Sequence, residues 1–327
     1  MRVLKSNDYK LFEQLVKIKQ PALLKTMSNF LKKHYKTVVT RKDYVYAIGD
    51  IPVALVAHLD TVFKTPPEDI YYDQQKNVMW SPEGLGADDR AGVFAIVKII
   101  RQGYHPHIIL TADEELGAIG AKQLVSDVKT PFADMKYIIQ LDRRGTNDCV
   151  FYNCYNEDFI EYVESFGFIE AFGSFSDISE ICPKWGIAGV NLSIGYQNEH
   201  SYTETLHINA FLATIDKVVN MLKDIENSKY FFYLPMTGLG NSWRYIGVDW
   251  LGDEIKCHCC NQYYSDYEMF PVKGLDKHTY FYCPDCLIGK VNWCDICGEA
   301  FEISPDNPEE KLCPDCGGKV NAAQGRS

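Results

Sequence analysis

The stretch Pro52–Asp60, PVALVAHLD, decides the fold of this chain. Its first six residues form a continuous apolar run with no polar alternation. A strand with apolar side chains on both sides has to be covered on both faces, as the strands of parallel α/β sheets are. The run ends on His58-Leu59-Asp60, so the sequence predicts a buried strand that carries a histidine and a carboxylate at its end.

Helical and strand patterns alternate on both sides of this run. Residues 9–33 have apolar positions three and four apart, which predicts two short helices broken at Pro21. Strands are expected at 37–40 and 44–48, and a hairpin at 70–80. The expected order after the hairpin is helix 90–102, strand 107–112, helix 118–128, strand 137–141, strand 150–152, helix 158–166, strand 189–194 and helix 208–227. This alternation predicts an α/β fold, with a mixed, mostly parallel sheet sandwiched between helices.

The length of 327 residues favours one large domain with a small appendage. The alternation stops near residue 228, so we expect a catalytic domain over 1–228. Residues 229–250 are rich in aromatic side chains and predict a connecting segment that packs on the main domain. Residues 251–327 are dense in cysteine and turn residues, and are expected to form a second domain.

The charge of the chain excludes some classes of partner. The formal net charge is −11, which argues against a general binder of nucleic acid or of anionic membranes. The amino terminus has no apolar signal-peptide core, and no run of about 18 apolar residues follows. A cytoplasmic protein is therefore expected, and clustered cysteines predict metal ligands rather than disulfides.

Four further segments place acidic or imidazole side chains where strands are expected to end. They are GADDRAG at 86–92, DEE at 113–115, LD at 141–142 and EHSYTE at 199–204. Ligand sites of open α/β sheets gather at the carboxyl ends of the strands. Several carboxylates in one cleft need cations to neutralise them. Carboxylates mixed with two imidazoles suit zinc, or less specifically manganese or cobalt.

The order H-x-D, G-A-D-D-x-x-G, D-E-E-x-G, L-D and H-S-x-x-E resembles the co-catalytic dizinc exopeptidases. That clan includes leucyl-type and tetrahedral aminopeptidases, glutamate carboxypeptidases and peptidase T. The resemblance covers about residues 50–225. It implies that His58 and Asp142 hold one zinc ion, and that Glu115 and His200 hold the other. The resemblance also implies that Asp88 bridges the two ions.

The resemblance assigns two further carboxylates. Glu114 would be the general base, taking a proton from water and passing it to the departing amine. Asp60 would fix the tautomer of His58. In the clan the peptide bond after the bridging aspartate is often cis, so a cis bond is expected between Asp88 and Asp89. The implied reaction is peptide hydrolysis by a zinc-bridged hydroxide.

Spacing favours an aminopeptidase among these enzymes. His58 and Asp88 are 30 residues apart, and Asp142 and His200 are 58 apart, so neither interval holds an extra domain of about 100 residues. Alternatives with the same metal chemistry are an amide deacylase, a dipeptidase or a carboxypeptidase. An arginine of the pair Arg143–Arg144 in the cleft would favour the last two by binding a substrate carboxylate. A non-catalytic binding protein on the same fold is a further alternative.

The carboxy-terminal cysteines form four C-x2-C pairs, which predict zinc ribbons. Paired in order, they give two closed structural zinc sites. The first comprises Cys257, Cys260, Cys283 and Cys286, and the second Cys294, Cys297, Cys313 and Cys316. Crossed pairing, with the first pair sharing zinc with the third, would give a RING-like brace instead.

The charge of the cysteine-rich tail bears on its partners. From residue 251 onward, 13 acidic and 7 basic residues give a net charge of −6, which opposes phosphate binding. We therefore expect no nucleic acid. A contact with a second copy of the chain or with another protein is the favoured role of the tail.

Overall fold

The computed structural model describes residues 4–129, 134–235, 254–265, 269–287, 290–294, 300–304, 307, 310–314 and 316–317. The chain divides into two compact units, Met1–Gly238 and Leu239–Ser327, which we describe one at a time. Among the described residues, no helix is both long enough and apolar enough to cross a membrane.

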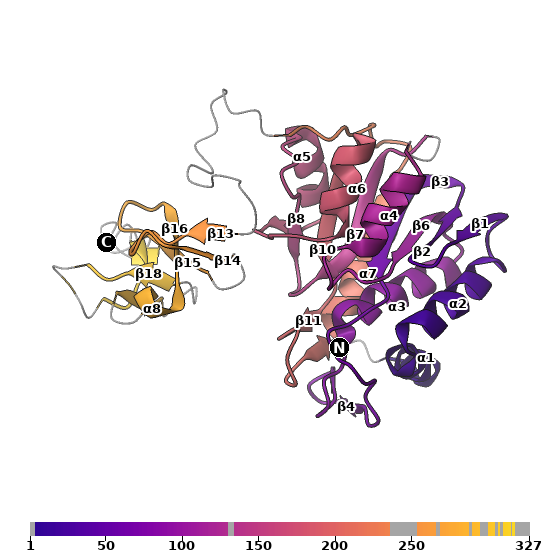
Figure 1. The fold of residues 1–327 in the computed structure, drawn as a ribbon, viewed down its shortest axis with the longest axis horizontal. Helices are drawn as coiled ribbons and strands as arrows, with labels where there is room; N and C mark the ends of the chain where they lie inside the picture. The colour runs from indigo at the N-terminus through magenta and orange to yellow at the C-terminus, as the bar shows by residue number, and fades with distance from the viewer. Residues whose placement is uncertain are drawn as a thin grey trace, which may run out of the picture. The chain divides into compact units, whose positions relative to one another are not determined.

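The first unit is built on an eight-stranded sheet with the order β1-β2-β6-β3-β7-β10-β8-β9 (Figure 1). The strands are β1 (Thr37–Thr40), β2 (Tyr44–Ile48), β3 (Ile51–His58), β6 (Pro106–Thr111), β7 (Tyr137–Arg143), β8 (Asp148–Val150), β9 (Ile169–Glu170) and β10 (Gly189–Ser193). The central strands β6, β3, β7 and β10 run parallel, whereas β1, β2 and β8 join by antiparallel pairing. The predicted mixed, mostly parallel α/β sheet is confirmed.

Helices cover both faces of this sheet. They are α1 (Ser6–Lys17), α2 (Gln20–Leu31), α3 (Ala87–Arg101), α4 (Ile119–Asp127), α5 (Glu157–Ser165), α6 (Asp177–Trp185) and α7 (Ile208–Lys223). Side chains of α1, α2, α3, α5 and α7 share one core, whereas those of α4 and α6 share the other. In β3, Leu55 packs into the first core and Val56 into the second. The unbroken apolar run of β3 thus fills two cores at once.

A four-stranded sheet, in the order β11-β12-β5-β4, accompanies the main one in the first unit. Strands β4 (Tyr71–Asp73) and β5 (Val78–Trp80) form the predicted hairpin. Strands β11 (Tyr196–Gln197) and β12 (Thr205–His207) were not expected from the sequence. Because β12 pairs with β5, the segment after β10 is tied to the hairpin.

Several predicted boundaries need correction. Helix α6 was not predicted: its buried residues Ile178, Ile181, Cys182 and Trp185 have helical spacing, but Pro183 inside the segment indicates a break. Strand β8 ends at Val150, near where the sequence places its start, and α7 ends at Lys223 rather than at 227. Pro21 lies in the first turn of α2, where it needs no hydrogen-bond partner for its nitrogen, so the break between the two helices comes before it.

The aromatic connecting segment is described as far as residue 235. The Phe231 N–H donates to Lys136 O, the Ala188 N–H donates to Phe231 O, and the Phe231 ring is buried against the main core. This part therefore packs on the first unit. The remainder of the expected segment, 236–250, lies outside the described residues.

The described residues of the second unit include short strands and a short helix. They are β13 (Glu254–Lys256), β14 (Tyr263–Ser265), β15 (Phe270–Lys273), β16 (Thr279–Tyr282), α8 (Pro284–Leu287), β17 (Val291–Trp293) and β18 (Ala300–Glu302). Strands β13 and β14 form a two-stranded sheet, and the remaining strands form a sheet in the order β16-β15-β18-β17. Its small cores are built around cysteines, including Cys257, Cys283 and Cys294.

Candidate active site

The ends of three neighbouring parallel strands bring the predicted site together. His58 is the last residue of β3, Asp142 lies near the end of β7, and Glu114 and Glu115 follow β6. Because β6, β3 and β7 are adjacent and parallel, their carboxyl ends meet at one edge of the sheet. Asp88, near the start of α3, completes the central part of the cluster.

Asp88 belongs to two groups of ligand-type side chains at once. His58, Asp88 and Asp142 form the first group, and Asp88, Glu115 and His200 form the second. In the first group, His58 Nε2 lies 3.1 Å from Asp88 Oδ1 and 3.4 Å from Asp142 Oδ1. In the second, His200 Nε2 lies 3.3 Å from Asp88 Oδ2 and 3.0 Å from Glu115 Oε1. Each oxygen of the Asp88 carboxylate therefore faces a different group.

The separations within each group fit ligands of one metal ion. Ligand atoms held about 2.0–2.1 Å from a tetrahedral zinc ion lie about 3.3 Å apart. The donors are imidazole nitrogens and carboxylate oxygens, which zinc and neighbouring divalent ions accept. The five residues that the resemblance assigned as ligands are thus the five that form these groups.

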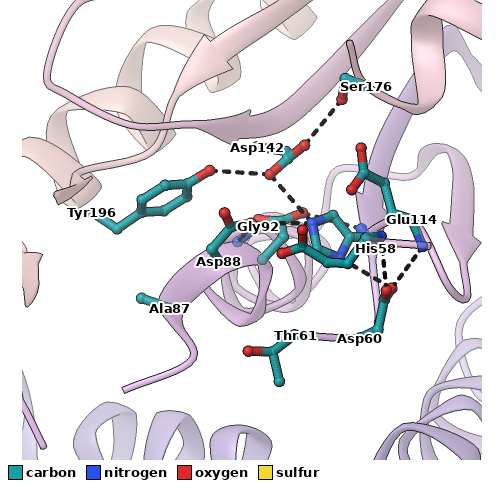
Figure 2. Close-up of polar contacts among 12 residues, drawn as sticks. His58, Asp60, Thr61, Ala87, Asp88, Gly92, Glu114, Asp142, Ser176 and Tyr196 are labelled. Atoms are coloured by element: carbon teal, nitrogen blue, oxygen red, sulfur yellow. Dashed lines mark hydrogen bonds and ion pairs between the residues drawn. The ribbon is translucent and has the colours of Figure 1, made fainter. Parts of the chain in front are cut away.

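Asp60 orients His58 from behind. Its carboxylate lies 3.2 Å from His58 Nδ1 and accepts the N–H groups of Glu114 and Glu115, each at 3.0 Å (Figure 2). Burial alone would raise the pKa of Asp60, but His58 and these N–H groups lower it below its ordinary value. An ionised Asp60 holds the Nδ1 proton of His58, which leaves Nε2 as the nitrogen that faces the first group.

Glu114 lies beside the ligands without belonging to either group. Its side chain is buried, and it forms a further cluster with His58 and Glu115. Burial raises the pKa of Glu114 to about 10, an effect that the neighbouring Asp142 and Asp177 carboxyl groups reinforce and His58 opposes. Divalent cations beside it would lower this pKa again and return Glu114 to its carboxylate form.

Asp142 is held by side chains that sequence reasoning did not find. Ser176 Oγ donates to Asp142 Oδ2 at 3.0 Å, and the Tyr196 hydroxyl donates to Oδ1 at 3.1 Å (Figure 2). Gln140 Nε2 also donates to Asp142 Oδ2, at 3.1 Å. Gln140 is two residues from Asp142 on the same strand, and its polar side chain in an apolar strand is a signal that was available. Ser176 and Tyr196 come from distant segments and have no such signal.

Asp89 connects α3 to β3. Its Oδ2 accepts the His58 N–H at 3.1 Å and its Oδ1 accepts the Gly92 N–H at 2.9 Å. The peptide bond between Asp88 and Asp89 is cis, as the resemblance implies. Asp89 is fully buried, so its role is to fix the backbone from which His58 projects.

Two further carboxyl groups, those of Asp177 and Glu204, are buried around the site. Burial raises the pKa of Asp177 to about 7 and that of Glu204 to about 8. Among the described residues, the buried Arg90 donates through Nη1 to the carbonyl oxygens of Leu15 and Ile18, and so anchors α1. Two divalent cations would supply the positive charge that these carboxyl groups favour.

Arg143 and Arg144, which follow Asp142, differ in exposure, as expected for neighbouring residues whose side chains point to opposite faces of a sheet. Arg144 is exposed and donates through Nη1 to Glu199 Oε1 at 2.9 Å, which engages its guanidinium at the surface. Arg143 is partly buried. The Arg144–Glu199 ion pair makes Arg144 a poor candidate for binding a substrate carboxylate.

The cysteines of the second unit also gather in groups. The sulfur atoms of Cys257, Cys260, Cys283 and Cys286 lie within 4.8 Å of one another. Those of Cys294, Cys313 and Cys316 form another such group, while Cys297 lies outside the described residues. No disulfide joins cysteines in the described part of the chain. The grouping follows the sequential pairing rather than the crossed one.

Comparison with known proteins supports the same chemistry. Residues 40–165 match the model of peptidase family M28, a range that includes every predicted site residue of the first unit except His200. No curated protein matches the chain.

The solved structures that share the fold include three peptidases. A tripeptidase from Staphylococcus aureus has a TM-score of 0.54 at 15% identity, covering 69% of this chain and 100% of its own. The aminopeptidase PepT from Bacillus cereus has a TM-score of 0.53 at 14% identity, covering 68% and 99%. The TET aminopeptidase from a Thaumarchaeota archaeon has a TM-score of 0.52 at 14% identity, covering 68% and 99%. Together, the family match and the shared fold confirm that the chain resembles the dizinc exopeptidases and is a metal-dependent hydrolase of the peptidase class.

Proposed function

We propose that this protein is an aminopeptidase that uses two divalent metal ions, zinc by preference, bound by the two groups that share Asp88. The observation that carries the proposal is the position of the Asp88 carboxylate, with one oxygen toward His58 and Asp142 and the other toward Glu115 and His200. A carboxylate that only stabilised the fold would not need an imidazole and another carboxylate next to each of its two oxygens.

The residues have separate roles in peptide hydrolysis. When bound, the ions would polarise the scissile carbonyl and lower the pKa of a water molecule toward about 7. Glu114 takes the proton of the attacking water and returns it to the nitrogen of the leaving amine, so the carboxylate is regenerated. Asp60 holds His58 in the tautomer that presents Nε2. Ser176 and Tyr196 hold Asp142 through its two oxygens.

Two observations favour an aminopeptidase over a carboxypeptidase. The intervals between the proposed ligands have no room for an extra domain, and Arg144, one of the two arginines considered for binding a substrate carboxylate, is engaged with Glu199. The structures that share the fold are named as aminopeptidases and a tripeptidase, which agrees with this choice. An amide deacylase with the same metal chemistry is the second candidate.

Turnover of matched substrates tests the proposal. The metal-loaded full chain is assayed on aminoacyl, N-acylaminoacyl and carboxy-terminal reporter substrates, before and after removal of the metal. We expect turnover of aminoacyl substrates that stops on chelation and returns with Zn²⁺, Mn²⁺ or Co²⁺. Preference for N-acylated substrates would instead establish the deacylase, and activity that is unaffected by chelation would refute both.

We further propose that the cysteine groups of the second unit hold one structural zinc ion each. Four thiolates within 4.8 Å of one another are the donor set of a closed zinc site. Substituting Cys257 and Cys260 with serine should lower the zinc content by about one ion per chain, whereas serine at Cys182, in the first unit, should not change it. If the pairing were crossed, Cys294 would share its zinc ion with Cys257 and Cys260, so the same double substitution would also leave the Cys294 thiolate without zinc.

The acidic tail is proposed as a contact surface for another protein or a second copy of the chain. Its negative charge supports this role over nucleic-acid binding. Light scattering of the full chain, with and without the Cys257 and Cys260 substitutions, measures whether self-association depends on the tail.

A further inference from the structure

Glu204 is a buried carboxyl group that belongs to neither of the two groups of candidate metal ligands. It lies four residues after His200 and is fully buried. Both of its oxygens are occupied by backbone N–H groups of a segment more than 100 residues away. Oε2 accepts from Gly86 at 2.5 Å and from Ala87 at 3.1 Å, and Oε1 accepts from Asp88 at 3.0 Å.

These three hydrogen bonds explain why a carboxylate is tolerated at this position. Burying a carboxyl group is costly unless its oxygens are hydrogen-bonded, and the three N–H donors offset part of this cost. The backbone at Asp88 and Asp89 is non-helical, so the N–H groups of Gly86, Ala87 and Asp88 precede the regular part of α3 and have no acceptor within the helix. Glu204, which directly precedes β12, supplies the acceptors that the start of α3 lacks.

One loop therefore contacts Asp88 in two ways. His200 lies beside the Asp88 carboxylate, at 3.3 Å from Oδ2, and Glu204 accepts from the Asp88 backbone. The position of the Asp88 backbone determines where its two carboxylate oxygens lie, and each oxygen faces one of the two groups. A shift of Asp88 would therefore disturb both groups together.

We infer that Glu204 is a positioning residue, which fixes the backbone of Asp88 so that its carboxylate serves the two metal groups at once. The inference rests on the proposed two-metal site. It assigns Glu204 a specific effect on metal binding, beyond any contribution to folding. The two variants that test it are Glu204→Gln and Glu204→Asp.

Glu204→Gln keeps the size of the side chain and removes the charge. An amide has one accepting oxygen, and its NH₂ group would face an N–H donor of the backbone. At least one of the three hydrogen bonds is therefore lost. The matched control is Glu83→Gln, because the Glu83 carboxylate also accepts backbone N–H groups, those of Glu68 and Asp69, in an exposed loop.

The experiment is a cobalt(II) titration of the metal-stripped full chain, followed by visible absorption. Cobalt bound by the thiolate groups of the tail also absorbs in the visible, but only these groups give a near-ultraviolet charge-transfer band, which measures their occupancy and allows their visible contribution to be subtracted. For Glu204→Gln we expect affinity at the shared site to fall at least tenfold, with an altered visible spectrum. The thiolate signal of Glu204→Gln and both signals of Glu83→Gln should match wild type.

The outcomes separate this inference from the proposed function. If wild type shows no visible cobalt signal beyond that of the tail, the two-metal site itself is wrong. If wild type binds cobalt there and Glu204→Gln binds it equally well, with an unchanged spectrum and only a lower melting temperature, Glu204 is structural and the inference is overturned. If Glu204→Gln does not fold, Glu204→Asp decides, because it keeps the charge and shortens the reach. If Glu204→Asp binds cobalt with the affinity and spectrum of wild type, the inference is also overturned.

Discussion

Asp60 shows how one carboxylate links the folding of a loop to the chemistry of its neighbour. It accepts the backbone N–H groups of Glu114 and Glu115 and holds Nδ1 of His58. The proposed base Glu114 and one proposed metal ligand from each group, Glu115 and His58, therefore depend on a single side chain. Such partners of metal-ligating histidines commonly matter by 10–100-fold in metal affinity or activity.

The substitution Asp60→Asn should test this link. The amide would keep the shape of the side chain but lose the charge that fixes His58, so we expect metal affinity or kcat to fall about 10–100-fold. The control is Asp73→Asn, since Asp73 also accepts two backbone N–H groups, those of Gln75 and Lys76, in an exposed turn. Equal kinetics and metal content for wild type and Asp60→Asn would contradict the assigned role.

At the scale of residues, the sequence predicted some members of the site and not others. His58, Asp88 and Glu115 were found because each stands in a short motif after an expected strand. Tyr196 and Ser176 were not found, because their contacts with Asp142 span 54 and 34 residues and leave no local pattern. A motif records which residues are next to each other in sequence, whereas these contacts depend on how the sheet closes.

At the scale of elements, the start of α3 is where packing and the site meet. A Cβ atom at Gly92 would lie 2.4 Å from Asp89 Oδ1 and 2.4 Å from Leu141 O. The helix can approach β7 this closely only because position 92 has no side chain. The same Asp89 carboxylate accepts the His58 N–H, so this close approach positions a proposed ligand.

Gly92→Ala is therefore expected to destabilise the fold. Overpacking of this kind costs about 1–3 kcal/mol, which urea unfolding will measure. The comparison variant is Gly103→Ala, where a Cβ meets no atom within 4 Å and only the positive φ of 91° opposes the change. If the two substitutions cost the same, steric contact at position 92 is not the reason for the glycine.

His107 in β6 gives a pH-dependent contribution that is separate from the metal groups. Burial lowers its pKa to about 4, and its Nδ1 accepts the Gly49 N–H at 3.1 Å. In the unfolded chain the imidazole takes up a proton near pH 6.5, so between pH 6.5 and 4 the unfolded state binds more protons. The free energy of unfolding should therefore fall as the pH is lowered through this window, by up to about 3 kcal/mol.

A His107→Asn variant should lose this part of the slope, because asparagine accepts the same hydrogen bond without titrating. Both proteins contain the same metal groups, so the difference between their stabilities at pH 4.5 and 7 isolates His107. His278→Asn, at an exposed position of the second unit, is the control and should keep the wild-type slope. Parallel slopes for wild type and His107→Asn would show that the imidazole is not held neutral.

The elements themselves were predicted well where their pattern was regular. The run PVALVA predicted a strand covered on both faces, and β3 packs into two separate cores. Helix α6 and strand β12 were missed, the first because of Pro183 and the second because three residues carry no periodicity. Short elements depend on their tertiary partners, here β5 for β12, and a sequence pattern does not contain those partners.

At the scale of the whole molecule, the two compact units carry two kinds of side-chain group that could hold a metal ion. The first unit offers carboxylates and imidazoles near the carboxyl ends of parallel strands, and the second offers thiolates in short turns. Open sites of the first kind suit catalysis, whereas closed four-thiolate sites suit structural roles. With both kinds filled, about four zinc ions per chain are expected.

The central claim is that Glu114 acts as the base of a two-metal peptidase, and Glu114→Gln tests it most directly. Steady-state turnover of an aminoacyl substrate and metal content are measured on wild type, on Glu114→Gln and on Asp113→Asn. Asp113 is the neighbouring carboxylate, and it contacts Gln20 in α2 instead of the ligands. We predict that Glu114→Gln keeps the metal content of wild type while kcat falls by at least about 100-fold, and that Asp113→Asn keeps most of its activity. Full activity of Glu114→Gln with its metal bound would contradict the account.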